Sequence, residues 1–374
     1  MRSPGRHRAW MIAPYTHSRK YRAALPMVLA FVGALVFAVP AAAFSSNWTS
    51  PKRILAHDGQ PLHASVVDGS GHVHVASEKG SKGIHYMTNK SGSWKTCQLT
   101  FKNDRYPSIT VAGDVVYFVF ARQTAGEKGL YTAASDQPVQ AAAGCGFATT
   151  KRYTGGAGSS AVGVSGSQMH IAFRTSTKKL KYHRGNPASA DWTVRENIDG
   201  KCCTSAPAMY FTTSGSVRVA YGDGTKKAEG LKFALRSSGK WKKSKAAGGR
   251  VKYVDLVLDH SPGVFTPPNN HPRIAYVVKR KGVSVANKAA PNAKGSWSRF
   301  FIGRHFGPTG LVYWSNQQKV LISGKGKMAM TTSGGPIYYT QAISNNGKDS
   351  KGVFMGDRLT FSRKGKGVFY TRLK

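Results

Sequence analysis

The sequence predicts an all-β fold, a β-propeller of seven, alternatively six, four-stranded blades. Three observations predict it. Short apolar runs separated by polar or glycine turns recur as a unit, an aromatic residue opens each fourth run, and the last unit lacks its fourth run. Glycine is abundant and Val, Thr, Tyr and Ser dominate most segments, which favours strands and tight turns over helices. Units of four strands over about 40–50 residues are typical of propeller blades.

The clearest unit spans residues 64–100, with its second run at 73–76, its third at 84–86 and its fourth opening at Trp94. Further second runs stand at 116–119, 169–172, 217–220, 273–276, 320–322 and 358–361. Further third runs stand at 130–131, 180–182, 231–233, 283–285, 328–330 and 368–370. The aromatic residues that open fourth runs are Trp94, Phe147, Trp192, Trp241, Trp297 and Tyr338, spaced 41 to 56 residues apart.

The final unit stops after its third run, and a matching fourth run stands near the other end of the domain. Asn47-Trp48-Thr49 follows the pattern of Ser93-Trp94-Lys95. An N-terminal strand that completes the C-terminal blade would close the ring and remove both sheet edges. Residues 308–352 repeat poorly, which leaves six blades open as the alternative count. A β-sandwich or a pair of small barrels is the alternative fold.

Residues 1–43 have the pattern of a signal peptide. Six basic residues and no acid precede the uncharged run 23–43, which ends in Pro40-Ala41-Ala42-Ala43. Small residues in this A-x-A pattern are typical of a signal-peptidase site. An uncleaved membrane anchor is the alternative, because about 20 uncharged residues can span a bilayer. In both cases residues 44–374 are predicted to form a propeller domain outside the cytoplasm, secreted or at the cell surface.

All four cysteines lie in this domain, where an oxidising compartment favours disulfides over a metal site. A bridge between the neighbours Cys202 and Cys203 would be strained, because their Cα atoms lie only about 3.8 Å apart across a trans peptide. The remaining pair, Cys97 with Cys145, would then join adjacent blades, and this is the favoured pairing of the three that are possible. The spacing fits no zinc motif, and neither a metal nor a cofactor is expected.

The charge of the chain is strongly positive and indicates an anionic partner. The formal net charge is +39, and without the six cations of the signal segment +33 remains on residues 44–374. A charge of magnitude about 2–8 is enough to keep a small domain soluble. The excess therefore favours a polyanion: an anionic cell-wall polymer, an acidic polysaccharide or an anionic membrane surface.

The cations are predicted to gather at one end of the blades. Strict antiparallel alternation puts the turns between second and third strands at the same end as the connections between blades. These turns carry seventeen basic and four acidic residues, whereas the turns between first and second strands contain no Lys or Arg. The predicted polyanion-binding residues are Lys79, Lys82, Lys128, Lys178, Lys179, Lys226, Lys227, Lys279, Arg280, Lys281, Lys325, Lys327, Arg363, Lys364 and Lys366; Arg122 and Arg174 complete the seventeen.

One blade pattern resembles a known family. Tyr106-Pro107-Ser108-Ile109, a Gly/Asp turn and a following Val-x-Val run resemble the sialidase-like and BNR-repeat propellers of exported bacterial proteins. The resemblance covers most of residues 46–374. Three turns, 91–94, 238–241 and 294–297, keep the Gly and Trp of that family's S-x-D-x-G-x-T-W box but lack its Asp.

The resemblance implies glycoside hydrolysis as an alternative function. A sialidase-type site needs a carboxylic acid beside an arginine that binds the substrate carboxylate, and Asp104 with Arg105 is the best local match. The family's Phe-Arg-Ile-Pro motif is absent.

Three functions therefore remain in view. The first is a non-catalytic binding propeller whose Lys/Arg-rich end holds an anionic polymer or surface. The others are a sialidase-like hydrolase and a protein-interaction scaffold. A lysine-rich composition indicates diffuse charge attraction, and the turns hold no interleaved aromatic set, so sequence-specific nucleic acid is not expected as a partner. The domain is expected to be a monomer.

Overall fold

The computed structural model describes residues 48–57, 62–100, 102–135, 145–189, 192–224, 229–259, 271–288, 296–303, 309–314, 317–324, 327–333, 338–344, 349–355 and 357–374. All of them belong to one compact unit, Ala42–Lys374, and the predicted signal segment 1–43 lies outside the described residues. Within these ranges the one helical element is a 3-10 turn, η1 (Gly80–Lys82), and no described helix is long and apolar enough to cross a bilayer. The prediction of an all-β fold is confirmed.

The described strands form seven antiparallel sheets of four strands each. The first sheet contains β2 (His63–Val67), β3 (Val73–Glu78), β4 (Ile84–Thr88) and β5 (Lys95–Gln98). The second contains β6 (Asp104–Ala112), β7 (Val115–Arg122), β8 (Gly129–Ser135) and β9 (Thr149–Thr154). The third contains β10 (Ala157–Ser165), β11 (Gln168–Thr175), β12 (Leu180–Gly185) and β13 (Val194–Asp199).

The fourth sheet contains β14 (Ala208–Phe211), β15 (Val217–Asp223), β16 (Gly230–Ser237) and β17 (Lys240–Gly248). The fifth contains β18 (Val251–Asp259), β19 (His271–Val278), β20 (Gly282–Lys288) and β21 (Trp297–Gly303). The sixth contains β22 (Thr309–Trp314), β23 (Gln317–Gly324), β24 (Lys327–Ser333) and β25 (Tyr338–Ser344). The seventh contains β26 (Asp349–Met355), β27 (Arg358–Arg363), β28 (Gly367–Arg372) and β1 (Lys52–Leu55).

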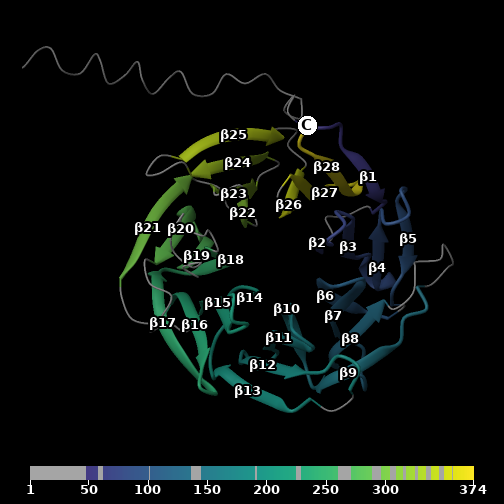
Figure 1. Ribbon diagram of the computed structural model, residues 1–374, viewed down its shortest axis with the longest axis horizontal. Helices are drawn as coiled ribbons and strands as arrows, with labels where there is room; N and C mark the ends of the chain where they lie inside the picture. Colours follow the sequence, from purple (N-terminus) through teal and green to yellow (C-terminus); the bar gives the residue numbers. More distant parts are fainter. Residues whose placement is uncertain are drawn as a thin grey trace, which may run out of the picture. The chain divides into compact units, whose positions relative to one another are not determined.

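Figure 1 shows the seven sheets standing around a common centre, with the first strand of each sheet innermost. Six sheets pair four strands in chain order, whereas the seventh has the order β1-β28-β27-β26. The second and third runs expected from the sequence lie on the second and third strands of these sheets. The alternation of apolar and polar residues within each run, together with the recurrence of the four-run unit, located these strands correctly. Both signals come from the same inward-facing positions of the strands.

The core lies between neighbouring sheets. Aromatic residues that open fourth runs pack there against the preceding sheet, which explains why they recur along the sequence. Trp241 packs edge-on against Tyr182 of the preceding sheet, with ring centroids 5.1 Å apart. Trp297 packs in the same way against Phe233, at 5.4 Å. A large ring at this position fills the wedge between two twisted sheets and buries apolar area on both. The regular recurrence of these aromatic residues along the sequence therefore reflects contacts between neighbouring sheets.

The seventh sheet is completed by residues from both ends of the described chain. Lys52 of β1 pairs with Tyr370 of β28, and Trp48 forms a further antiparallel bridge to Leu373. Leu55 shares a buried cluster with Val73 of the first sheet. The strand that the sequence placed at Asn47-Trp48-Thr49 thus begins with a bridge at Trp48 and continues as β1.

The structure pairs the cysteines in the arrangement that the sequence favoured. Cys97 of β5 is bonded to Cys145, with a Cα–Cα distance of 5.1 Å, and this bridge joins the first sheet to the segment before β9. Cys202 is bonded to Cys203 in the connection between the third and fourth sheets. Both residues of the second bridge are buried in a cluster with Tyr221.

Candidate functional site

The two ends of the sheets carry different connections. The crossover face is the end that holds the turns between second and third strands, such as 176–179, and the connections between sheets, such as 200–207. The hairpin face is the opposite end, which holds the turns between first and second strands and between third and fourth strands, such as 212–216 and 238–239. This division follows from antiparallel pairing in every sheet.

Most of the predicted polyanion-binding residues lie on the crossover face as exposed side chains. Nine are exposed: Lys82, Lys128, Lys178, Lys179, Lys279, Arg280, Lys281, Lys364 and Lys366. Lys79 is half-buried, and Arg363 places its guanidinium over the ring of Phe369, 4.5 Å from the centroid. Lys226, Lys227 and Lys325 lie outside the described residues, and Lys327 is the first residue of β24. None of the nine exposed cations forms an ion pair with an acid in the described ranges.

Glu127, an acid of this face, is already paired with cations. Glu127 accepts a hydrogen bond of 2.6 Å from the ammonium of Lys102 and one of 3.2 Å from Arg122. The hydrogen bond from Lys102 is the main cause that lowers the pKa of Glu127. Arg122 also binds Asp104 and is itself buried, so it is not an available surface cation, which corrects its place among the seventeen turn residues.

Two further acids near this face, Asp199 and Asp223, are also paired with a cation. Burial alone would raise the pKa of Asp199, but hydrogen bonds from the Tyr221 hydroxyl (2.8 Å) and the Lys232 ammonium (3.2 Å) lower it. Lys232 also forms an ion pair with Asp223. Because these carboxylates are occupied, the exposed lysines face solvent without local competition from them.

On the crossover face, a cavity of about 570 Å³ concentrates positive charge. Five of its lining residues are cations and none is an acid; the five are Arg174, Lys178, Lys201, Arg250 and Lys252. We name this set the cationic pocket. None of its members forms an ion pair within the described residues.

The vicinal disulfide forms part of the wall of the cationic pocket. The backbone N–H of Cys202 donates a 2.7 Å hydrogen bond to the carbonyl of Lys178, which ties the turn after β11 to the connection after β13. Lys178 has a φ of 60°, in the left-handed region, so the turn reverses tightly at this residue. A turn of the third sheet and the connection from the third sheet to the fourth are thereby held together, and the cations that they carry face one cavity.

The weak catalytic candidates Asp104 and Arg105 are not brought together. Asp104 is fully buried, and both of its carboxylate oxygens accept hydrogen bonds from Arg122, at 2.9 and 3.1 Å. The guanidinium of Arg105 is partly exposed and lies 3.8 Å from Glu78. Successive strand residues point to opposite sides, whereas Asp104 and Arg122 are register partners across β6 and β7. The acid therefore has Arg122 as its partner, and Arg105 lies near a different acid, Glu78.

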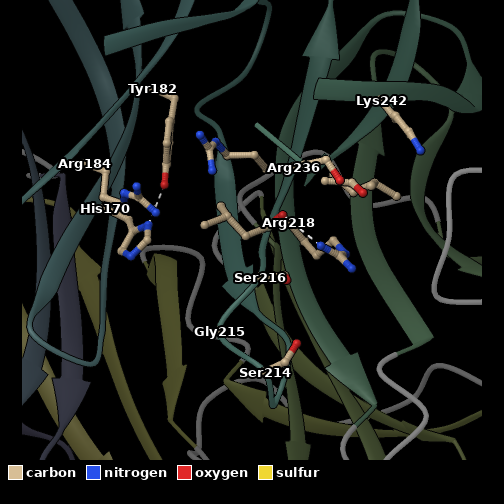
Figure 2. Close-up of a pocket in the computed structure, with 13 residues that line it drawn as sticks. His170, Tyr182, Arg184, Ser214, Gly215, Ser216, Arg218, Arg236 and Lys242 are labelled. Atoms are coloured by element: carbon tan, nitrogen blue, oxygen red, sulfur yellow. Dashed lines mark hydrogen bonds between the residues drawn. The ribbon is translucent and has the colours of Figure 1, made fainter. Parts of the chain in front are cut away.

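Positive charge also gathers on the hairpin face, where the turn sequences alone do not predict it. Figure 2 shows Arg184, Arg218, Arg236 and Lys242 around the cavity of about 650 Å³ between the third and fourth sheets. The turn 214–216 contains no cation, in agreement with the sequence, and the four cations come from the flanking strands.

Among the described residues, no group of three or more His, Cys, Asp or Glu gathers as metal ligands would.

Comparisons with known proteins identify the fold. No family model and no curated protein matches the sequence. The SapL1 lectin, solved with α-methyl fucoside, aligns with a TM-score of 0.54 and 12% identity over 78% of this chain and 99% of the lectin. A PL25 ulvan lyase aligns with a TM-score of 0.61 and 10% identity over 86% of this chain and 95% of the lyase. The Aleuria aurantia lectin aligns with a TM-score of 0.51 and 11% identity, over 78% and 98%. The chain thus shares the propeller-like all-β fold of lectins and polysaccharide lyases.

Proposed function

We propose that this chain is an exported, closed seven-bladed propeller that binds an acidic polysaccharide through the crossover face. The cationic pocket is the observation that carries the proposal. Its five cations and its lack of acids make a cavity that is complementary to a chain of carboxylate or sulfate groups. Exposed lysines and Arg280 on the other turns of the face extend the positive surface around it.

The arrangement suits a polymer better than a single small anion. Most of the cations are exposed lysines, whose compact ammonium groups attract charge without fixing a particular geometry. Each exposed contact contributes little by itself, because water and salt screen it. A polymer that touches several of them at once sums these contributions, as multivalent ligands do. Sheets that are held by disulfides and buried aromatic rings keep the cations in fixed relative positions.

The proposal of export is supported by the chemistry of the cysteines. Two disulfides join the four cysteines, and disulfides persist in oxidising compartments. The propeller-like neighbours are lectins and polysaccharide lyases, which supports a saccharide as the partner over a lipid surface. The ring closure that we propose rests on the pairing of β1 with β28.

The test is retention of the purified full chain on immobilised polygalacturonate and on neutral dextran across a sodium chloride gradient. A variant with Lys178→Gln, Lys201→Gln and Lys252→Gln removes three cations from the cationic pocket. We expect stronger retention on polygalacturonate than on dextran, and about tenfold weaker affinity of the variant, since three screened charge contacts are lost.

The matched control is Lys52→Gln, Lys90→Gln and Lys240→Gln, which makes the same change in charge at exposed positions away from the crossover face. It should elute close to the unmodified protein. Equal weakening by both variants would contradict the assignment to the cationic pocket. Failure to distinguish polygalacturonate from dextran would contradict an acidic polysaccharide, and tighter binding to phosphatidylglycerol vesicles than to either polymer would assign the face to a membrane.

The sialidase-like hydrolase and the protein scaffold remain as predictions from the sequence. The same preparation tests the first on a panel of fluorogenic glycosides, including sialosides. Release of fluorophore that is lost in a folded Asp104→Asn variant would favour the hydrolase. Retention that is insensitive to both salt and the cationic-pocket variant would favour the scaffold.

A further inference from the structure

The cavity on the hairpin face is built from two adjacent sheets. The third sheet contributes His170, Tyr182 and Arg184, and the fourth contributes the turn after β14 and the facing ends of β15 and β16. Its volume, about 650 Å³, falls in the range of small-molecule sites. Its lining is mostly polar, which favours a hydrophilic ligand. It lies at the opposite end of the sheets from the cationic pocket, so the two sites can be tested separately.

One wall of the cavity contains a buried, electrically neutral pair of side chains, His170 and Tyr182. The Tyr182 hydroxyl and Nδ1 of His170 lie 2.6 Å apart in a hydrogen bond, and both residues are buried. Burial, followed by the positive charges of Arg184 and Arg236, lowers the pKa of His170 to about 4. His170 is therefore neutral at ordinary pH and adds no charge of its own. Figure 2 shows this pair beside Arg184.

Arg236 lines the cavity, but its guanidinium is already bound by an acid. Its guanidinium binds Glu196 at 2.7 and 3.0 Å, and the indole N–H of Trp241 donates to the same carboxylate at 2.7 Å. The hydrogen bond from Arg236 is the main cause that lowers the pKa of Glu196. This ion pair neutralises Arg236, so its charge is not available to a ligand.

Arg184 and Arg218 differ from Arg236 because neither is bound directly by an acid among the described residues. Neither forms an ion pair in the part of the chain that the structure describes. The Nε atom of each is buried and donates no hydrogen bond to described atoms. Arg218 makes one contact of 3.1 Å, from Nη1 to the carbonyl of Val217, and burial lowers its pKa. A bound oxyanion would accept the hydrogen bond that each of these buried Nε atoms lacks among the described residues.

The remaining edge of the cavity supplies hydroxyl groups. Ser214 and Ser216 flank Gly215 in the turn after β14, and the Ser214 hydroxyl lies 2.9 Å from that of Thr212. Gly215 has a φ of 77°, and a Cβ atom there would lie 2.8 Å from the hydroxyl of Ser165 in the third sheet. This close approach and the positive φ favour glycine at this position of the turn. A cavity lined by these hydroxyls and by the guanidinium groups of Arg184 and Arg218 suits a ligand that is itself rich in hydroxyls and carries one acidic group.

We propose that this cavity binds one acidic saccharide unit, whose carboxylate or sulfate group is held by Arg184 and Arg218 and whose hydroxyls meet Ser214 and Ser216. Arginine suits this role because its planar group donates two parallel hydrogen bonds to a carboxylate or sulfate. Lys242 adds a further positive charge at the rim. The inference goes beyond the proposed function, because it concerns the other face and a single sugar.

The test is calorimetric titration of the full chain with D-glucuronate, D-glucose 6-sulfate, D-glucose and inorganic sulfate. Binding of glucuronate or glucose 6-sulfate that exceeds binding of both glucose and inorganic sulfate would support the proposal. Absence of binding by both acidic sugars would overturn it. Equal binding of glucose would overturn the role of the arginines, and equal binding of inorganic sulfate would overturn the role of the sugar.

Two single variants locate the site, and each is used only if its circular dichroism matches that of the unmodified chain. Arg218→Gln and Arg184→Gln should each weaken binding of the acidic sugar at least tenfold, since each removes a charge-assisted hydrogen bond. Unchanged affinity in both folded variants would overturn the proposal. The triple cationic-pocket variant should bind the acidic sugar normally while losing polymer retention. Loss of polymer retention alone therefore reports on the crossover face, and loss of sugar binding alone reports on this cavity.

Discussion

The indole of Trp94 lies against the phenol ring of Tyr370, with ring centroids 5.2 Å apart and planes inclined by 58°. Trp94 precedes β5 of the first sheet, and Tyr370 belongs to β28 of the seventh. This contact between the first and seventh sheets resembles the packing of Trp241 on Tyr182 between the fourth and third sheets. The first and last sheets along the chain are therefore joined by the same kind of interface as sequence neighbours.

The first prediction concerns Trp48, which is 2% exposed and packs with Leu359, Phe361 and Phe369 of the seventh sheet. Trp48→Ala should lower the free energy of unfolding by about 3 kcal/mol or more, because it removes a large buried ring and leaves a cavity. Urea unfolding followed by circular dichroism measures this. Phe301→Ala, at a side chain that is 60% exposed, is the control and should change stability little. Equal stability of the two variants would show that Trp48 does not hold the seventh sheet together.

The second prediction concerns the bridge between Cys97 and Cys145, whose residues are 48 apart in sequence. The double change Cys97→Ser and Cys145→Ser should lower stability by about 4 kcal/mol, since a closed loop of this length restricts the unfolded chain. Thermal unfolding under non-reducing conditions measures the loss. A double variant as stable as the unmodified protein would mean that the bridge is not formed in solution.

The third prediction concerns the buried ion pair of Asp104 with Arg122. Asp104→Asn leaves the Arg122 guanidinium buried without its main counter-charge, and should cost about 3 kcal/mol of folding free energy. Asp114→Asn removes an acid whose side chain is 91% exposed and should be nearly neutral. Chemical unfolding of both variants gives the comparison. If Asp104→Asn is as stable as Asp114→Asn, the pair does not contribute to stability, and a functional role for Asp104 gains support.

The fourth prediction concerns the response of stability to pH. Burial lowers the pKa of His85, His170 and His183 from 6.5 to about 4 in the folded state. The unfolded chain then binds these protons more readily, so their contribution to stability is complete above 6.5 and is lost as pH falls from 6.5 towards 4. Each should contribute about 2 kcal/mol of loss between about pH 7 and about pH 5. Urea unfolding at the two pH values measures it.

The variant His170→Gln provides the internal comparison for this prediction. It removes one of the three titrating groups, so its stability should fall by about 2 kcal/mol less over the same range. Stability that is independent of pH between these values in the unmodified protein would contradict the lowered pKa values. An unchanged pH response in His170→Gln would assign the effect to other groups.

Much of the fold could be predicted because each signal was repeated. Trp192, Trp241 and Trp297 mark successive units, and alternation in the runs beside them fixes which strand lies where. A single unit would have been ambiguous between a sandwich and a propeller. The seventh sheet was found from its missing fourth run, which Trp48 and β1 supply.

The candidate sites were only partly predictable, because they depend on pairs that the linear sequence does not bring together. The location of turn lysines such as Lys178 was predictable, since turns between second and third strands can be assigned to one end by alternation alone. Arg218 was missed because it lies inside an apolar second run. His74 and His170 stand at the matching position of two other units, so an arginine there is a departure from the repeat that could have drawn attention to the cavity. The partner of Asp104 required the register of β6 against β7.

The pairing of β1 with β28 has a consequence for the order in which the molecule folds. Six sheets join strands that are close in sequence, so each can form as soon as its own short segment is available. The seventh joins strands from opposite ends of the domain and requires closure of a loop that contains all the others. Synthesis of the chain therefore leaves β1 without a neighbour until β28 has emerged. A premature stop before β28 would release a chain whose first six sheets can assemble but whose β1 edge stays open to pairing with other molecules.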